Sequence, residues 1–393
     1  MIDISKKRYL KYILFGSLYF SEGLQGTLAI VLIPAYLLEK GFPFPVATLV
    51  AAMFMVPWSL KFIWGGIVDK YSKNGRKKFI IFGGIFGAFG LFALAFIDPG
   101  LSLILFLIFL LVSHISVAFL DVSADALAIE TSKFEERGKI NGAMFTGLFG
   151  GMLISAPILG YIAHNFSYNT AFIIAGFIIL GILIFPIFVK EASIKRTKRP
   201  KVGKQLLLEY KKRPVQLISL FAPVTSISGG IIMFAMPLYM NEVLKLNIAQ
   251  IGLLNMVFPL GIIVGANVGG IFADSIGRKT SLYAILIASI FVYAALIFVS
   301  SWETVAIVYG AVGICFGAFH SISSAILMDI TNPEIGATQY GLFTSLFNAG
   351  EMGGEFATGT LIVLVGFTRL FLYAAILFWP GIIILHFIRY KDA

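Results

Sequence analysis

The chain has 393 residues, of which 59% are hydrophobic and 13% are charged, and its formal net charge at pH 7 is +10. This composition is much more apolar than that of an ordinary soluble domain, and it excludes a water-soluble monomer. Repeated apolar runs of about 20 residues are long enough to cross a hydrocarbon core of about 30 Å. The sequence therefore predicts an integral membrane protein that spans the bilayer with helices.

Twelve apolar segments are expected to be membrane-spanning helices. The apolar run of the first segment is too long for a cleaved signal peptide, so we interpret it as a span. The predicted spans cover residues 10–38, 45–69, 78–97, 101–126, 138–164, 168–189, 215–242, 248–273, 280–300, 304–330, 337–365 and 368–389. The expected fold class is an all-α integral membrane protein of two six-helix bundles.

The segment 190–214 separates the sixth predicted span from the seventh and carries ten basic and two acidic residues. It predicts a basic cytoplasmic linker, either a plain tether or an amphipathic segment lying on anionic headgroups. The predicted domains are an N-terminal bundle, 1–189, this linker, and a C-terminal bundle, 215–393. An inside N-terminus places 26 of the 30 lysines and arginines on the inner side. The positive-inside rule therefore predicts a cell-membrane protein with both termini in the cytoplasm.

Several functional classes are excluded by the sequence. The basic residues follow the loops and form no basic face on a soluble domain, so nucleic-acid binding is not expected. Cys315 is the single cysteine, so neither an intrachain disulfide nor a cysteine-based metal site is expected. Patterns typical of metalloproteases, serine hydrolases and nucleotide-binding loops are absent and the four histidines are scattered, so we expect no enzyme and no cofactor.

Glu22 lies well inside the first predicted span. Twelve residues of helix at 1.5 Å each place it about 18 Å from the cytoplasmic end. Carboxylates inside a membrane are costly and tend to be functional, so we expect Glu22 to couple protons or bind substrate, and nearby Gln25 to bind substrate. Lys61, in the second span, is expected to pair with Asp121 or Asp125, to hold an anionic substrate, or to extend to the headgroups.

Asp121 and Asp125 lie one turn apart on the fourth predicted span and therefore share a face. Like charges in a low dielectric disfavour each other's ionisation, which suits proton uptake and release near neutral pH. The alternative is a structural ion pair with Lys61 or Lys139. The pair is therefore a candidate proton-coupling or substrate-binding site.

The C-terminal half offers a second set of polar residues. Glu351 and Glu355 repeat the one-turn spacing on the eleventh span, as a coupling pair or as part of a Gly-rich helix crossing. His320 is expected to relay a proton or bind substrate, or else to be a structural histidine. Three amides are further candidates for substrate binding: Asn255, Asn267 and Asn348.

Two charged loops in the sequence have the same pattern. They read "GGIVDKYSKNGRKK" (65–78) and "GGIFADSIGRKT" (269–280). Their shared residues are Gly65, Asp69 and Arg76 in the first and Gly270, Asp274 and Arg278 in the second. Farther along each half, 135–149 and 333–347 also share Phe-Thr-x-Leu-Phe. These matches predict a duplicated bundle, an organisation typical of transporters with their site between the halves.

The pattern Gly-x-x-x-Asp-x-x-Gly-Arg-Lys, placed between spans 2 and 3 and again between spans 8 and 9, resembles the signature loop of the major facilitator superfamily. The resemblance implies that Asp69 faces the start of span 11 and Asp274 the start of span 5, where they help to hold the cytoplasmic side closed. An exposed carboxylate at a helix N-terminus contributes about 0.3–1 kcal/mol, which suits a latch that opens and closes. The family also implies a monomer.

Three further stretches, 59–71, 120–142 and 336–350, resemble the branch that contains the AmpG muropeptide permeases and the acetyl-CoA transporters. The shared features are a Lys-Phe-aromatic stretch before the first loop, two aspartates four residues apart, and Ala-Thr-Gln at the start of span 11. The resemblance implies transport of bulky polar or anionic solutes, in many members together with a proton. Glu22 and Gln25 depart from the usual residues of the branch.

The sequence therefore predicts a secondary active transporter that moves a small polar or anionic solute by alternating access, coupled to protons. Its 38 phenylalanines and 11 methionines favour an alternative, proton-driven efflux of amphipathic compounds. A lipid scramblase is the alternative from another class. The expected partners are a small-molecule substrate, H⁺ and the lipid bilayer.

Overall fold

The chain folds into two compact units of helices in a computed structural model that describes residues 2–3, 8–43, 46–47, 49–50, 53, 55–190, 201–246 and 248–388. Unit 1 comprises Met1–Ser132, Thr146–Gly203 and Asn332–Gly341, and unit 2 comprises Lys133–Phe145, Lys204–Thr331 and Leu342–Ala393. Of the linker predicted at 190–214, residues 191–200 lie outside the described part, and the rest holds helix α10 (Val202–Glu209). The domain division at this linker stays a prediction.

Ten helical segments of the described residues are long and apolar enough to cross a membrane. Nine correspond to one predicted span each, and the tenth, Pro333–Phe387, contains the last two predicted spans. These two are separated by a break at Gly366, which has φ 73° and ψ 167°. The predicted span 45–69 lies partly outside the described residues and otherwise holds two shorter helices. The predicted all-α membrane fold is confirmed.

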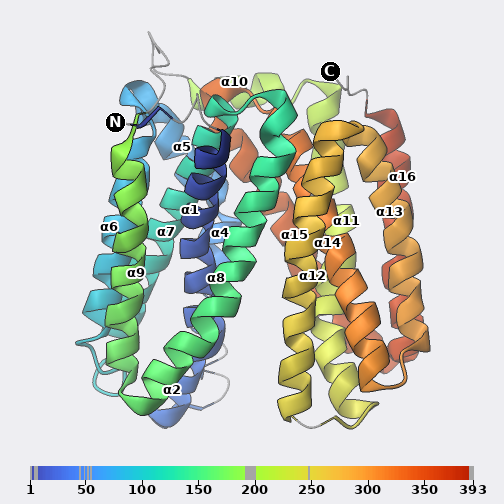
Figure 1. Ribbon diagram of the computed structural model, residues 1–393, viewed down its shortest axis with the longest axis horizontal. Coiled ribbons are helices and arrows are strands. Elements are labelled where there is room, and N and C mark those ends of the chain that lie inside the picture. Colours follow the sequence, from blue (N-terminus) through green and yellow to red (C-terminus); the bar gives the residue numbers. More distant parts are fainter. Residues whose placement is uncertain are drawn as a thin grey trace. The chain divides into compact units, whose positions relative to one another are not determined.

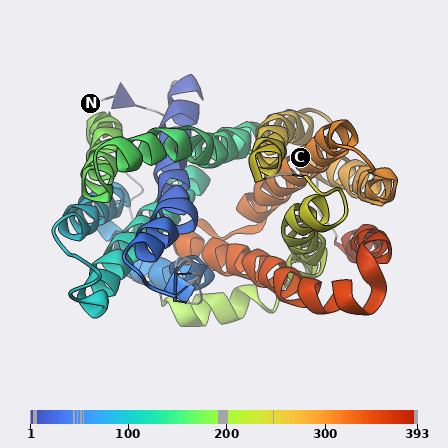
Figure 2. The same cartoon turned by 90° about the horizontal axis from the view of Figure 1, so that it is seen from below.

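The described part of unit 1 consists of helices that pack side by side and of two short strands. Its elements are β1 (Ile2–Asp3), α1 (Arg8–Thr27), the π-helix η2 (Leu28–Leu32), α2 (Ile33–Glu39), α4 (Met55–Ser59), α5 (Lys61–Tyr71), the 3₁₀ turn η3 (Ser72–Asn74), α6 (Lys77–Leu94), α7 (Leu103–Thr131), most of α8 (Arg137–Asn165), α9 (Tyr168–Phe188) and β2 (Val189–Lys190). Helix α6 lies beside α7 and α9 (Figures 1 and 2). The two short strands pair in parallel.

Local sequence signals explain where two of these helices begin. Ser102 precedes α7 and its hydroxyl accepts a hydrogen bond from the amide of Leu105. Ser167 does the same for α9 by accepting from Thr170. Serine is a favoured N-cap because its oxygen satisfies an amide that has no acceptor within the helix. The packing is then set by apolar contacts around Tyr36 of α2, which is buried in the core of unit 1.

Unit 2 contains a close crossing of two helices. Its elements are the 3₁₀ turn η4 (Phe134–Glu136), the start of α8, α10, α11 (Arg213–Glu242), α12 (Ile248–Ser275), α13 (Arg278–Ala294), the 3₁₀ turn η5 (Ala295–Phe298), α14 (Trp302–Ile330), most of α15 (Gly336–Ile376) and α16 (Phe378–Phe387). The 3₁₀ turn η6 (Pro333–Ile335), which precedes α15, belongs to unit 1.

Helices α12 and α14 cross at close range: a β-carbon on Gly265 of α12 would lie 1.9 Å from the carbonyl oxygen of Ile314 on α14. Small residues therefore bring these backbones together, as is common in membrane proteins.

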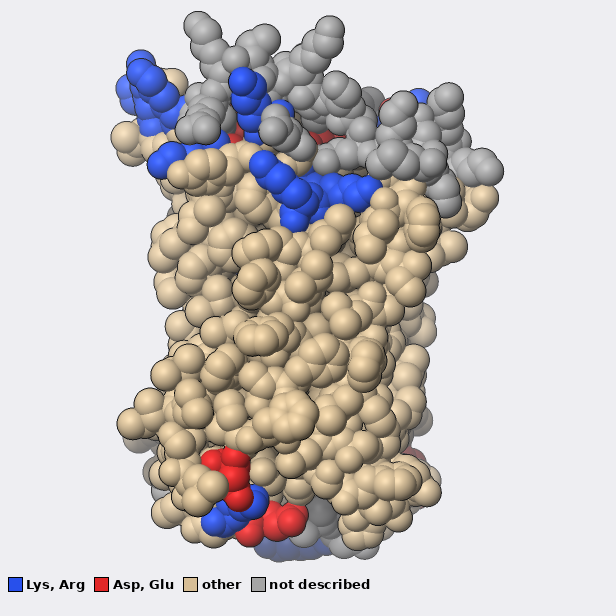
Figure 3. All heavy atoms as spheres, turned by 90° about the vertical axis from the view of Figure 1, so that its left-hand side faces the viewer, with Lys and Arg blue, Asp and Glu red and all other residues tan. Residues whose placement is uncertain are grey.

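The charged side chains on one face of unit 1 lie at its two ends, as expected for a protein that spans a bilayer. On the face shown in Figure 3, lysine and arginine side chains gather at one end and charges of both signs at the other. The band between them is covered by other residues. Phe82, Phe89 and Phe177 are each more than half exposed on α6 and α9. Exposed apolar side chains of this kind are stable against lipid rather than water.

Candidate functional site

Five ionisable side chains from three helices meet inside unit 1. Glu22 and Tyr19 lie three residues apart on α1, Lys61 is the first residue of α5, and Asp121 and Asp125 lie one turn apart on α7. The ammonium of Lys61 is 2.5 Å from Oδ2 of Asp121 and 4.0 Å from Oε1 of Glu22. The hydroxyl of Tyr19 donates to Oδ1 of Asp125. We call these five residues the acidic cluster.

The acidic cluster is buried and its carboxylates outnumber its basic groups. Glu22 is 8% exposed, Lys61 is 6% exposed, and Asp121 and Asp125 are each 1% exposed. One ammonium can balance the charge of only one of the three carboxylates. A buried charge without a counter-ion costs several kcal/mol. The cluster is therefore well suited to bind protons or a cation, and Lys61 is placed to interact with an anion.

Gln25 lies one turn beyond Glu22 and is fully buried. Its amide nitrogen donates to the hydroxyl of Ser113 at 2.8 Å, and that hydroxyl donates to the carbonyl oxygen of Gly87, also at 2.8 Å. These bonds connect α1, α7 and α6 within unit 1. They place Gln25 at a helix contact, and its predicted role in substrate binding stays a prediction.

Unit 2 brings His320 of α14 next to Glu351 of α15. Nε2 of His320 lies 3.1 Å from Oε1 of Glu351. Four phenylalanine rings surround the imidazole, with centroid distances between 4.2 and 5.9 Å: Phe316, Phe319, Phe347 and Phe145. The side chains of His320 and Glu351 keep 12% and 19% of their surface exposed. We call this arrangement the aromatic cage, and it combines a titratable pair with an apolar surface.

The other candidates of the C-terminal half are more dispersed. Glu355 is exposed one turn beyond Glu351 on α15. The side-chain amide of Asn267 donates to the carbonyl oxygen of Ile263 in its own helix at 2.8 Å. Asn255 of α12 and Asn348 of α15 are partly exposed. The predicted roles of these residues stay predictions.

The first signature loop binds the start of α15 through Asp69. Oδ2 of this buried carboxylate accepts hydrogen bonds from the amide of Thr338 at 2.7 Å and from its hydroxyl at 2.6 Å. Oδ1 accepts from the amide of Ala337 at 3.3 Å and from Arg76 at 2.6 Å. Arg76 is fully buried and also donates to Glu130 at the end of α7. Asp69 therefore lies at the helix start that the family resemblance implied.

The second signature loop repeats this arrangement at the start of α8. Asp274 accepts hydrogen bonds from the amides of Gly138 and Lys139, both at 2.9 Å. Arg278 is fully buried and donates to Asp274 at 2.9 Å and to Asp329, at the end of α14, at 2.8 Å. The N-terminal amides of a helix lack acceptors within the helix and favour a nearby carboxylate. Each signature aspartate therefore acts as a cap on a helix distant in sequence.

The signature glycines are required by the close approach of these helices. A β-carbon on Gly65 would lie 2.3 Å from the carbonyl oxygen of Ala337, and one on Gly270 would lie 2.3 Å from that of Gly138. Any larger side chain would push the aspartate one turn later away from its helix start. In the pattern Gly-x-x-x-Asp, the glycine thus allows two helices to pack closely, and the aspartate one turn later caps the start of the partner helix.

Sequence reasoning missed Tyr19, Glu130 and Asp329. Tyr19 gave no signal because an aromatic residue is unremarkable in an apolar span. Glu130 and Asp329 are separated by nearly the same interval as the matching threonines, Thr146 and Thr344. A comparison of the two halves that continued farther toward the N-terminus of each repeat would therefore have paired Glu130 with Asp329.

Membrane-spanning helices with buried ionisable side chains, together with two signature loops whose aspartates cap helix starts in the same way, define a membrane transporter rather than an enzyme. The chain belongs to the Major Facilitator Superfamily, whose family model matches residues 15–227 and 218–393. It is therefore a multi-pass integral membrane protein that moves small molecules by secondary transport.

Similar proteins agree with this assignment. The chain is 26% identical to the multi-drug resistance efflux pump PmrA of Streptococcus pneumoniae over 387 residues, and 25% identical to the putative transporter AmpG 4 of Rickettsia conorii over 383 residues. Both alignments cover 91% of each chain. The crystal structure of the human organic anion transporter MFSD10 has a similar fold, with a TM-score of 0.74 and 14% identity over 96% of this chain and 99% of that one. The resemblance to AmpG-like members of the superfamily is confirmed.

Proposed function

We propose that the protein is a proton-coupled transporter of a small polar or anionic solute, and that the acidic cluster is its coupling site. The observation that carries this proposal is the burial of three carboxylates around a single lysine. Ionisable groups placed inside the membrane are costly, so they persist where transport needs them. The mechanism is alternating access, in which solvent reaches the cluster from one side of the membrane at a time.

Charge balance explains why the cluster would exchange protons. Lys61 compensates Asp121, and Tyr19 supports Asp125 with one hydrogen bond, which leaves an excess of negative charge. A bound proton removes the cost of this excess while the cluster is shielded from water. When the cluster opens to a compartment of higher pH, hydration stabilises the carboxylates and the protons leave. Proton binding and release therefore follow the conformational cycle.

The same geometry supplies a link between the proton and an anionic solute. Lys61 pairs with Asp121, with 2.5 Å between Nζ and Oδ2. Protonation of Asp121 would weaken that ion pair and free the ammonium to bind a carboxylate or phosphate of the solute. Each ligand would then favour binding of the other, which is the thermodynamic requirement for symport. Glu22, whose Oε1 lies 4.0 Å from Nζ of Lys61, would receive a second proton in the same way.

The signature loops are proposed to stabilise the state that is closed on their side of the membrane. Asp69 and Asp274 would hold the first turns of α15 and α8 in that state and release them when it opens. The excess of basic residues near these loops supports a cytoplasmic position for them and for both termini. We further propose that the protein works as a monomer in the cell membrane.

A second candidate function is proton-driven efflux of amphipathic compounds. The aromatic cage around His320 and Glu351 favours it, because aromatic rings beside a carboxylate can hold an organic cation. The similarity to the efflux pump PmrA supports the same reading. In this case a cationic compound would compete with protons for carboxylates instead of binding together with them.

Proton flux into liposomes tests the leading proposal. The purified protein is reconstituted with a pH-sensitive dye inside, and an anhydro-muropeptide is added outside as the anionic solute. We expect acidification with the wild type and with Glu135→Gln, which alters an exposed loop carboxylate, and none with Glu22→Gln or Asp125→Asn.

Three results would count against this proposal. Wild-type flux in Glu22→Gln and Asp125→Asn would exclude the acidic cluster as the coupling site. No flux with the muropeptide, in liposomes that expel a fluorescent amphipathic cation when a proton gradient is imposed, would favour efflux. Transfer of labelled lipid between leaflets without any gradient would indicate a scramblase instead.

A further inference from the structure

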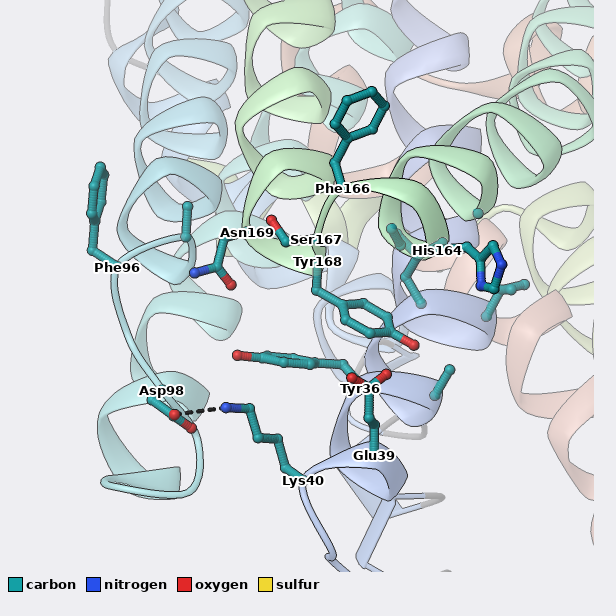
Figure 4. A pocket seen from close by; sticks show the side chains of 16 residues that line it. Tyr36, Glu39, Lys40, Phe96, Asp98, His164, Phe166, Ser167, Tyr168 and Asn169 are labelled. Atoms are coloured by element: carbon teal, nitrogen blue, oxygen red, sulfur yellow. Dashed lines mark hydrogen bonds and ion pairs between the residues drawn. The ribbon is translucent and has the colours of Figure 1, made fainter.

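A cavity of about 810 Å³ lies in unit 1 away from the acidic cluster. It is bounded by the end of α2, the loop between α6 and α7, and the turn between α8 and α9 (Figure 4). Helix α2 lies at the opposite end of unit 1 from α5, which leads into the first signature loop (Figure 1). Cavities of this volume accommodate small organic molecules. Neither the proposed coupling site nor the signature loops use it.

Two stacked tyrosines form a firm wall of this cavity. The rings of Tyr36 and Tyr168 lie 4.7 Å apart at an angle of 28°. Tyr36 is only 5% exposed, and its ring also packs against Phe106 and Phe172 at 6.0 Å. The hydroxyl of Tyr168 points toward the carboxylate of Glu39 (Figure 4). The core of unit 1 therefore fixes the wall, and the wall in turn orients Glu39.

The charges of the cavity do not balance. Nζ of Lys40 is 2.7 Å from Oδ2 of Asp98, across the mouth from α2 to the loop after α6. The hydrogen bond from Lys40 lowers the pKa of Asp98, and the same bond raises the pKa of Lys40. Both groups therefore stay charged at neutral pH and neutralise each other. Glu39 is exposed and forms no ion pair of its own among the described residues, because Lys40, whose ammonium also feels the charge of Glu39, is held by Asp98.

Two exposed phenylalanines line the same cavity, on sides different from that of Glu39 (Figure 4). Phe96 is 84% exposed and Phe166 is 72% exposed, and both line the cavity. Tyrosine rings at the ends of membrane spans lie at the level of the headgroups, and Tyr36 and Tyr168 stand at such ends of α2 and α9. An amphiphile could therefore place its polar group near Glu39 and its apolar part along these rings. An anion would first have to displace Asp98 from Lys40.

We propose that this cavity binds an ammonium group carried on an apolar body, with Glu39 as the counter-ion. The stacked tyrosines and the exposed phenylalanines contact the apolar part. Such a group occurs in the ethanolamine headgroup of a phospholipid and in free amphiphilic amines. The site would then bind either a lipid of the surrounding leaflet or a soluble amine.

Binding of dansylcadaverine, an amphiphilic primary amine, tests the site. The full chain is purified in dodecyl maltoside, and probe fluorescence is titrated against empty micelles, with dansylglycine as the matched anionic probe. We expect the amine to bind and dansylglycine not to bind. Glu39→Gln should weaken binding about tenfold, because a hydrogen bond to a charged group is lost. Lys40→Gln should strengthen binding, because it releases Asp98 as a second carboxylate.

Controls separate this site from the transport site and identify the source of the amine. Glu22→Gln should bind the amine like the wild type, so failure of the coupling proposal would leave this result unchanged. Displacement by short-chain phosphatidylethanolamine but not by phosphatidylglycerol would support a lipid ligand, and displacement by neither would support a soluble amine. Equal displacement by both lipids, binding of dansylglycine as tight as that of the amine, or unchanged binding in a monodisperse Glu39→Gln variant would overturn the proposal.

Discussion

Replacement of Asp69 by asparagine should release the first turn of α15. Asp69 accepts three hydrogen bonds there, from the amides of Ala337 and Thr338 and from the hydroxyl of Thr338. A hydrogen bond to a charged group contributes about 1 kcal/mol more than one to a neutral group. Three such bonds therefore amount to about 3 kcal/mol, which corresponds to an increase of about 100-fold in the population that lacks them.

Hydrogen exchange measures this change directly, because two of the three affected donors are backbone amides. We expect the amides of Ala337 and Thr338 to exchange about 100-fold faster in Asp69→Asn, since exchange follows the population of the open form. The matched control is Asp274→Asn, which should accelerate exchange at Gly138 and Lys139 instead.

The two variants also distinguish the loss of one helix cap from destabilisation of the whole protein. Faster exchange at both helix starts in either variant would indicate that the protein as a whole is destabilised. Unchanged exchange at Ala337 and Thr338 in Asp69→Asn would refute the capping role of this carboxylate. A neutral substitution at Thr338, Thr338→Val, should produce a smaller acceleration because it removes only the hydroxyl bond.

Two further predictions concern the stability of unit 1, and thermal unfolding in detergent measures both. Gly65→Ala should destabilise the protein by about 1–3 kcal/mol, because its β-carbon would lie 2.3 Å from the carbonyl oxygen of Ala337. Gly66→Ala is the control: its β-carbon would have no atom within 4 Å, so this variant should be neutral or slightly stabilising. Equal unfolding midpoints for the two variants would contradict the close approach of the helices at Gly65. The bond from Lys40 lowers the pKa of Asp98, so the pair should add stability at neutral pH and lose it as the pH falls below about 4. The midpoint difference between wild type and Asp98→Asn should therefore vanish in acid, and a difference that persists at pH 2 would exclude this cause.

Much of the candidate site could be anticipated from residue type and depth alone. Glu22, Asp121 and Asp125 stand out because a carboxylate inside an apolar run requires an explanation. The one-turn spacing also placed the two aspartates on a single face before any packing was known. The duplicated loops predicted two related latches, and the two signature aspartates do cap helix starts in the same way.

Partner choice, in contrast, could not be predicted. Both Lys61 and Lys139 were candidates for the aspartates of the fourth span. Lys61 pairs with Asp121, whereas the backbone amide of Lys139 donates to Asp274 at the start of α8. A lysine side chain can reach several neighbours, so its partner depends on which helix faces it and on the rotation of each helix about its axis.

The sequence by itself determined that this protein spans a membrane, repeats one bundle design and places carboxylates inside it. Those features depend on hydrophobicity, spacing and charge along the chain, which are local and additive. Only the tertiary structure decided that Tyr19 bonds to Asp125, that Phe145 and Phe347 lie against His320, and that Glu39 lines a cavity beside stacked tyrosines. These contacts join residues far apart in the chain, and they depend on how close-packed helices fit against each other.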